Sequence, residues 1–160
     1  TEHKYKSSYE RIGKAVLKYS SLPKMDVTNF FELVLFSWLT GNNDMHLKNF
    51  SLYEAADKIR LTPAYDLLNA AIINPKDDEE LALTLNGRKK KLQREDFIKS
   101  AVTLDIENVI VERLINKYIK LLPKFEAVIQ SSFLSAELKE KYGELLKERV
   151  ERLSTNATKR

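Results

Sequence analysis

A polar segment that directly follows an apolar stretch carries residue types suited to phosphoryl transfer. It reads Asn42-Asn43-Asp44-Met45-His46-Leu47-Lys48-Asn49. Phosphoryl transfer needs a carboxylate that orients the attacking hydroxyl or accepts its proton, and oxygen ligands that hold Mg²⁺ against the nucleotide phosphates. Asp44 would supply that carboxylate, while Asn49 and Asp66, the latter beyond a predicted hairpin, would supply metal ligands. Because Mg²⁺ prefers a small number of oxygen ligands, this set is adequate for chemistry on ATP.

The spacing of this loop matches the D-x-x-x-x-N pattern of protein kinases, in which a metal-binding Asp follows later. The spacing alone is weak, because Asn and Asp after a helix usually form a C-cap and a turn. His46 lies where a cation or hydrogen-bond donor would face the transferring phosphoryl group, or it is a structural histidine. Lys48 would either do the same or pair with a carboxylate. Asp66 has an alternative role as the N-cap of a helix beginning at Leu67.

Hydrophobic spacing predicts a mainly α fold with two small β-hairpins. A first helix covers 9–19 after Ser7 and Ser8, which suit an N-cap. A second helix, capped by Asp26 and ended by Gly41, has apolar residues on most sides, so we expect it to be central and largely buried. The residues on its main face are Val27, Phe30, Phe31, Val34, Leu35, Trp38 and Leu39.

The remaining elements follow from alternation, turn residues and helical spacing. Strands over 50–54 and 58–62 predict one hairpin, and strand 81–85 followed by Asn86-Gly87, a type I′ turn signal, predicts another. A short helix covers 95–102. Asp105 is expected to cap a helix over 106–122 that Pro123 ends; another helix runs through Ile129, and Ser135 opens the last one. We treat 1–160 as a single domain with a frayed tail over 154–160.

Composition excludes several classes of protein. The 160 residues contain no Cys, only two His and four Gly, which removes thiol nucleophiles, disulfide scaffolds, multi-histidine metal sites and glycine-rich phosphate loops. There is no secretory signal and no apolar stretch long enough for a bilayer, so we expect a cytoplasmic protein without a membrane partner. The absence of an initiator Met suggests a fragment of something longer. The net charge of +4 is modest, although the run 88–91 is basic and leaves weak DNA contact open.

Taken with its surroundings, this loop resembles the HipA-like serine/threonine kinases of bacterial toxin–antitoxin systems. The resemblance rests on S-S-Y-E-R-I, F-S-W-L-T-G-N-N-D-M-H-L-K-N-F-S, L-T-P-A-Y-D-L-L and L-A-L-T-L-N-G, in the family's order within residues 7–100. It implies the C-terminal lobe of a protein-kinase-like fold, with Asp44 as catalytic Asp and Asn49 and Asp66 as Mg²⁺ ligands. His46 and Tyr65 would lie near the nucleotide, although Tyr65 also suits a core position.

The resemblance implies partners as well as a reaction. Acceptors in the family are protein Ser or Thr side chains, in known members on an aminoacyl-tRNA synthetase, and the partner is a DNA-binding antitoxin of the HipB type. The chain departs from the family in lacking the N-terminal lobe, with its phosphate-gripping loop and ATP-anchoring Lys. Because positioning is most of phosphoryl-transfer catalysis, we expect the isolated chain to be nearly inactive.

Two other functions remain open on the sequence. One is a small-molecule kinase of the aminoglycoside or choline type, which also uses a D-x-H-x-x-N loop, although T-P-A-Y-D-L-L and L-T-L-N-G argue against it. The other is a non-catalytic module that binds an antitoxin or DNA through the basic run 88–91, a property that would give steeply salt-dependent binding.

Overall fold

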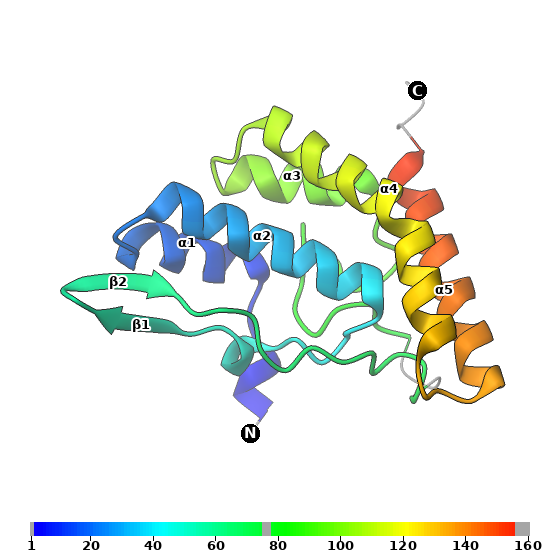
Figure 1. Ribbon diagram of the computed structural model, residues 1–160. Helices are drawn as coiled ribbons and strands as arrows, with labels where there is room; N and C mark the ends of the chain where they lie inside the picture. Colours follow the sequence, from blue (N-terminus) through cyan, green and yellow to red (C-terminus); the bar gives the residue numbers. More distant parts are fainter. Residues whose placement is uncertain (1, 75–77, 156–160) are drawn as a thin grey trace.

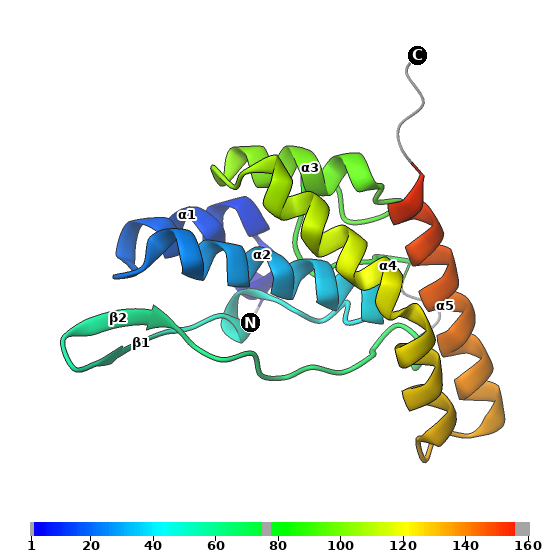
Figure 2. The same cartoon turned by 45° about the horizontal axis from the view of Figure 1, so that its top comes forward.

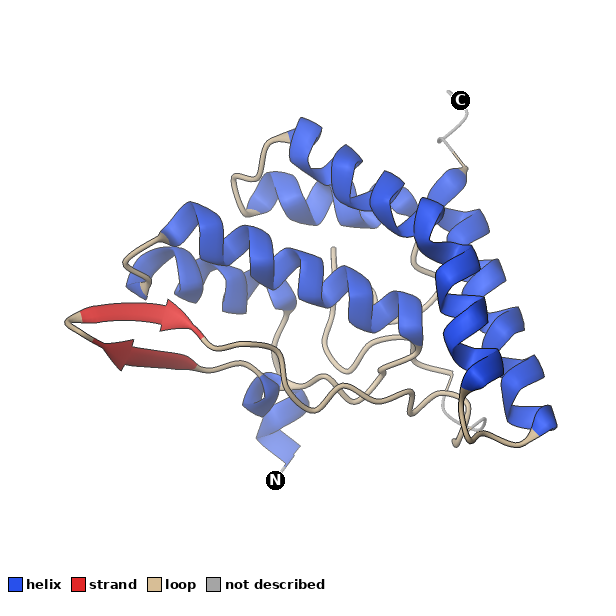
Figure 3. Cartoon of the chain, in the orientation of Figure 1, coloured by secondary structure: helices blue, strands red, loops and turns tan. Residues whose placement is uncertain are grey.

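The computed structural model describes residues 2–74 and 78–155, and most of them are helical (Figures 1 and 3). This confirms the predicted mainly α architecture. In chain order the elements are η1 (Glu2–Tyr5), α1 (Tyr9–Tyr19), α2 (Pro23–Thr40), η2 (Leu47–Asn49), β1 (Leu52–Ala55), β2 (Lys58–Leu61), α3 (Arg94–Thr103), α4 (Asn108–Ser131) and α5 (Ala136–Ser154).

Helix α2 is the centre of the core, as its apolar pattern predicts. Its residues Phe30, Leu35, Trp38 and Leu39 have no exposed surface. Helix α1 lies along one side of it, and α3, α4 and α5 close the others (Figures 1 and 2). Even Phe36, on the opposite side of α2, packs on aromatic rings of α4. Burial on nearly all sides makes α2 a rigid base for the loop that leaves its carboxyl end.

The ends of the first helices follow local rules in two cases and not in a third. Ser8 caps α1 by accepting a hydrogen bond from the Arg11 N–H, and Gly41 ends α2 in the left-handed conformation with φ of 84°. The predicted N-cap Asp26 is wrong. Helix α2 begins at Pro23, a residue whose fixed φ suits the first helical position, and Asp26 lies one turn further in.

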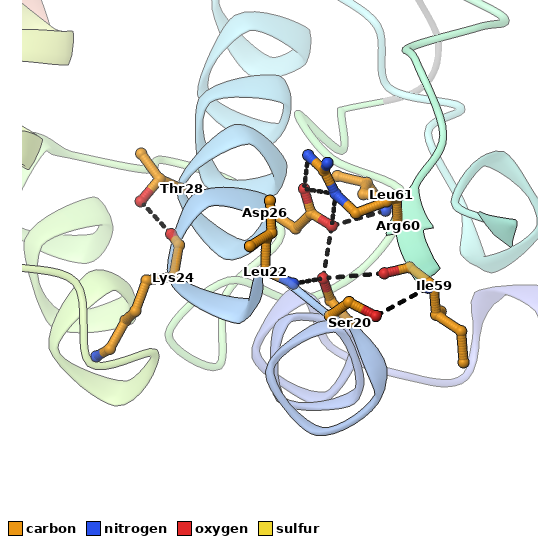
Figure 4. Close-up of polar contacts among 9 residues, drawn as sticks. Ser20, Leu22, Lys24, Asp26, Thr28, Ile59, Arg60 and Leu61 are labelled. Atoms are coloured by element: carbon orange, nitrogen blue, oxygen red, sulfur yellow. Dashed lines mark hydrogen bonds and ion pairs between the residues drawn. The ribbon is translucent and has the colours of Figure 1, made fainter. Parts of the chain in front are cut away.

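Asp26 holds the hairpin against the helices instead (Figure 4). Its buried carboxylate accepts hydrogen bonds from the Arg60 guanidinium at 3.1–3.3 Å, the Leu61 N–H at 2.9 Å and the Ser20 hydroxyl at 2.6 Å. Burial by itself would raise the pKa of Asp26, but the Arg60 and Ser20 hydrogen bonds outweigh it and hold that pKa below its ordinary value. The ionised carboxylate therefore fixes where the chain leaves β2.

The first hairpin matches its prediction closely. Strand β1 pairs antiparallel with β2, with Leu52 opposite Leu61 and Ala55 opposite Lys58. The connecting residues Ala56 and Asp57 have φ of 49° and 59°, the backbone of a type I′ turn.

The second predicted hairpin forms only its turn. Asn86 and Gly87 have φ of 48° and 76°, as expected for type I′, but the flanking pairing is one isolated bridge between Leu85 and Arg88. Thr84 pairs in parallel with Ser8 instead, and the buried leucines of the segment point into the core. Segment 81–85 therefore packs on the start of α1 and does not form the regular antiparallel pairing that its alternating residues predicted.

Two boundaries in the C-terminal half are also wrong. Helix α4 begins at Asn108 with Glu107 as N-cap, whereas Asp105 lies in a left-handed turn with φ of 54°. Pro123 does not end the helix, which runs on to Ser131. A proline inside a helix costs about 3 kcal/mol. Packing of Phe125 against Tyr118 and of the buried Ile129 offsets that cost. Of the predicted frayed tail, Ser154 ends α5, and 156–160 lie outside the described residues.

Glu80 connects the end of α2 to α5. One carboxylate oxygen accepts from the Trp38 indole N–H at 2.9 Å and the Leu92 N–H at 3.1 Å, and the other accepts from Arg152 at 2.9 Å and the Lys91 N–H at 3.0 Å. The Arg152 guanidinium also lies over the Trp38 ring. Burial would raise the pKa of Glu80, but the hydrogen bonds from Trp38 and Arg152 hold it below the ordinary value.

Candidate functional site

The loop after α2 and the segment after β2 form one unit. Gly41 closes α2 with a positive φ, and its carbonyl accepts a hydrogen bond from the Ala71 N–H at 3.1 Å. The Asn42 amide donates to the Asp66 carbonyl at 3.0 Å. The positive φ at position 41 favours glycine, and a Cβ there would also press on the Asn69 side chain. The two segments thus bring residues 42–49 beside residue 66.

Asn49 and Asp66 make direct side-chain contact, since the Asn49 Nδ2 donates to the Asp66 Oδ2. The Asn49 Oδ1 accepts from the His46 N–H at 3.1 Å, which fixes the amide at the start of η2. Asn49 is buried and Asp66 is exposed, so the pair opens to solvent on the Asp66 side. Asp66 has φ of 57°, a conformation that Asp and Asn tolerate best after glycine.

The Asn49–Asp66 pair suits a metal ion that brings ligands of its own. In the described part of the chain, no group of three or more His, Cys, Asp and Glu side chains could hold a metal ion. One amide and one carboxylate nevertheless fit Mg²⁺, which is usually bound through one or two carboxylates together with substrate phosphates and water. An ion at this pair would take its remaining ligands from those sources.

Asp44 is half-buried at the mouth of the loop. The Tyr5 hydroxyl, from η1, donates to the Asp44 Oδ1 at 2.8 Å. The neighbouring Met45 is fully buried, and its carbonyl accepts from the Tyr9 hydroxyl of α1 at 2.8 Å. Burial raises the pKa of Tyr9 above its ordinary value, which keeps this hydroxyl protonated as a donor. Two tyrosines thus tie the loop to the N-terminal elements.

The other predicted site residues surround this centre. His46 is only 7% exposed; the Tyr5 ring meets it edge to face with centroids 5.3 Å apart, and among the described residues its Nδ1 has no hydrogen-bond partner. Lys48 is exposed, and its carbonyl accepts from the Tyr65 hydroxyl at 2.9 Å. Tyr65 is 38% exposed, so the alternative of a core position is wrong. The alternative of a helix capped by Asp66 is wrong too, because residues 62–70 are irregular.

A hollow of about 420 Å³ opens beside Asp44. It is lined by Tyr5, Asn43, Asp44, Ala70, Asn74, Glu79, Ala82 and Lys89. A substrate group that reached into this hollow would meet the Asp44 carboxylate.

The charged runs of the sequence pair with each other at the edge of this hollow. Lys89 forms an ion pair with Glu79 at 3.0 Å, and Lys90 forms one with Asp78 at 2.6 Å. Residue 77, the first of the predicted acidic run, lies outside the described residues. The basic run 88–91 is therefore partly neutralised by the preceding acidic run.

Sequence reasoning missed the residues that hold the loop. Helical spacing places Tyr9 at the start of a helix without indicating a contact to the loop, and nothing in the sequence marks Tyr5 or Asn42 as partners of it. Their contacts with Met45, Asp44 and Asp66 cross 24–39 residues of sequence. The local signal in the sequence is the polar loop itself, and no local pattern indicates which distant hydroxyl reaches it.

The fold and the site define a mainly helical module with a polar loop on the end of a buried helix, built around an Asp, an Asn and a later Asp. The sequence model of the HipA-like C-terminal domain matches residues 1–125. The chain belongs to this family, as the sequence motifs predicted.

Individual relatives agree with the family assignment. A Haemophilus influenzae protein named "Putative kinase" is 26% identical over 144 residues, which cover 79% of this chain and 42% of that protein. A Sinorhizobium fredii protein named "Putative kinase Y4dM" is 34% identical over 113 residues, which cover 69% of this chain and 27% of that protein. The chain therefore spans less than half the length of these relatives.

A solved structure shows the same fold. HipA of Shewanella oneidensis MR-1, in a complex of HipA, HipB and operator DNA, superposes with a TM-score of 0.76 at 20% identity. The match covers 91% of this chain and 35% of that one.

Across residues 2–74 and 78–155, none of the helices combines the length and the apolar character that crossing a membrane requires.

Proposed function

We propose that this chain is the C-terminal catalytic lobe of a HipA-like kinase that transfers the γ-phosphoryl group of ATP to a Ser or Thr side chain of a protein. The single observation that carries the proposal is the side-chain contact between Asn49 and Asp66, with Asp44 in the same loop beside an open hollow. Membership of the HipA-like family and the kinase names of the longer relatives support it.

Each residue has a defined task in this proposal. Asp44 orients the acceptor hydroxyl and accepts its proton. Asn49 and Asp66 hold Mg²⁺, which neutralises charge on the phosphates when it is bound. His46, Lys48 and Tyr65 line the nucleotide side of the loop. Mg²⁺ takes oxygen ligands, so an ion between this pair would replace the Asn49–Asp66 hydrogen bond, and the Asn49 amide would turn its Oδ1 from the His46 N–H toward the ion.

The activity belongs to a longer protein in this proposal. The relatives extend well beyond the matched residues, and positioning of ATP from a second lobe accounts for much of the catalysis of phosphoryl transfer. We therefore expect the 160-residue chain alone to bind Mg²⁺ and ATP weakly and to turn over very slowly. An aminoacyl-tRNA synthetase, the acceptor in known family members, is the first protein substrate to test.

The test uses conservative substitutions in the full-length protein that contains this chain. Asp44→Asn and Asp66→Asn should each abolish transfer from ATP while leaving thermal unfolding unchanged. Asn is suited to position 66, where φ is 57°, so loss of activity would not reflect backbone strain. Asp57→Asn is the matched control, because Asp57 also has a positive φ, 59°, in the exposed hairpin turn. Full activity in either site variant would refute the assigned role.

A second function is favoured by the structural neighbour, which is a complex of HipA with HipB and operator DNA. We propose that this chain also takes part in binding a HipB-type antitoxin and, through it, DNA. Direct DNA contact through 88–91 is a weaker option, since Lys89 and Lys90 are already in ion pairs. Titration with the antitoxin, with and without DNA, separates the two: binding that needs DNA and vanishes when 88–91 are neutralised would favour direct contact.

A small-molecule kinase of the aminoglycoside type is the remaining alternative. Transfer to aminoglycosides or choline in the absence of any protein acceptor would favour it over the protein-kinase proposal.

A further inference from the structure

Tyr5 contacts two of the proposed site residues at once. Its hydroxyl donates to the Asp44 Oδ1 at 2.8 Å, and its ring packs edge to face on His46 with centroids 5.3 Å apart. It comes from η1, about forty residues before the loop, so neither contact follows from local turn geometry. Within residues 2–74 and 78–155, the Tyr5 hydroxyl is the group that donates a hydrogen bond to the Asp44 carboxylate. An orienting donor on a general base is a recurrent feature of catalytic sites.

We propose that Tyr5 is a positioning residue for Asp44: its hydroxyl fixes one carboxylate oxygen so that the other faces an acceptor hydroxyl entering the hollow beside it. This inference rests on the proposed function of Asp44. A hydrogen bond to an ionised carboxylate is roughly twice as strong as one between neutral groups, which suits it to selecting a single rotamer.

The alternative role for Tyr5 is a plug that occupies the place of the acceptor hydroxyl. The shape of the site argues against it. Tyr5 and Asp44 both line the hollow of about 420 Å³, so the space beside the carboxylate is open rather than filled by the phenol. The Tyr5 side chain lies on one wall of the hollow, 38% exposed, with the Lys4 ammonium 4.7 Å from its ring centroid. The acceptor therefore has room to approach Asp44 past Tyr5.

The contact with His46 adds to the positioning role. His46 is buried under the Tyr5 ring, and its backbone N–H anchors the Asn49 amide at 3.1 Å. A single residue thus braces the loop at Asp44 and close to the first metal ligand. Removing only the hydroxyl separates the two contributions, since phenylalanine keeps the ring against His46.

The kinetic test compares Tyr5→Phe with Tyr19→Phe in the full-length protein, using labelled ATP and dephosphorylated casein as the acceptor probe. Tyr19 is a suitable matched control, because it lies at the end of α1 and is 53% exposed. We expect kcat to fall about tenfold in Tyr5→Phe with the KM for ATP unchanged, since one charge-assisted hydrogen bond is worth about that factor. Tyr19→Phe should match the wild type.

The other kinetic outcomes distinguish failure of the positioning role from failure of the proposed function. An unchanged kcat in Tyr5→Phe, with Asp44→Asn inactive, overturns the positioning role and leaves the proposed function standing. A raised kcat/KM for casein overturns it in favour of the plug. Activity that persists in Asp44→Asn overturns the proposed function itself, and the positioning role with it.

A second readout needs no turnover and uses the 160-residue chain as it is. Three-bond NMR couplings from the backbone nitrogen and carbonyl to the Asp44 Cγ report the χ1 angle of that side chain. We expect values of a single rotamer in the wild type and in Tyr19→Phe, and averaged values in Tyr5→Phe. Couplings that stay at single-rotamer values after loss of the hydroxyl would contradict the proposal.

Discussion

Substitution of Glu80 by Gln tests how strongly the end of α2 depends on one carboxylate. Each oxygen of Glu80 accepts two hydrogen bonds: one serves Trp38 and Leu92, and the other serves Arg152 and Lys91. Glutamine keeps one acceptor oxygen and replaces the other with an amide NH₂ group, which must face two donors. Two hydrogen bonds are therefore lost; Trp38 and Leu92 on one side are buried, whereas on the other side Arg152 is largely buried and Lys91 is exposed. At about 1–2 kcal/mol for each, the free energy of unfolding should fall by about 2–4 kcal/mol.

The measurement is chemical denaturation at neutral pH, with Glu148→Gln as the matched control. Glu148 also pairs with Arg152, at 3.3 Å, but its side chain is 67% exposed. Exposed pairs contribute about 0–1 kcal/mol, so the control should unfold close to the wild type. If Glu80→Gln cost no more than Glu148→Gln, the inference that Glu80 joins α2 to α5 would be refuted.

The same carboxylate predicts the direction of a pH effect. Its pKa is lower in the folded chain than its ordinary value of 4.5, so its contribution to stability is fully present above pH 4.5. That contribution is lost as the pH falls through the lower, folded pKa. The gap in stability between wild type and Glu80→Gln should therefore shrink at acid pH. A gap that stayed constant down to pH 3 would contradict the lowered pKa.

Three further substitutions test other parts of the fold. Tyr9→Phe removes the buried hydrogen bond to the Met45 carbonyl and should lower the free energy of unfolding by about 1–2 kcal/mol in urea titrations. Gly41→Ala should cost about 1–3 kcal/mol by the same measurement, because φ is 84° and the new Cβ would press on the Asn69 side chain. Asp26→Asn should speed exchange of the Leu61 amide hydrogen at least about tenfold. Because the pKa of Asp26 is lowered in the folded chain, the exchange rate of the wild type should approach that of the variant as the pH falls below the ordinary Asp value.

Local chemistry accounts for the parts of the fold that could be predicted. Ser8, Gly41 and the Asn86-Gly87 turn each meet a demand of the backbone within four residues, so the sequence alone indicates them. The buried character of α2 followed from apolar residues on all its sides. The order of Asp44, Asn49 and Asp66 along the chain was likewise readable, and the structure brings the last two into contact.

The errors arose where distant parts of the chain override local preference. Asp26 has the chemistry of an N-cap, but Pro23 starts the helix and Arg60 claims the carboxylate. Pro123 has the chemistry of a helix end, but aromatic packing carries α4 past it. The role of Tyr5 could not be predicted, because a hydrogen bond across 39 residues leaves no periodic signal in the sequence.

The hydrophobic core has a consequence for where this unit can be cut. The family match ends at residue 125, yet Leu146, Val150 and Leu153 of α5 belong to the same buried cluster as Trp38. A fragment shortened to the matched region would leave one side of that cluster facing water, and about 1.5–3 kcal/mol is lost for each such side chain that is no longer covered. The family match therefore ends before the hydrophobic core does. A fragment that keeps this core intact must include α5.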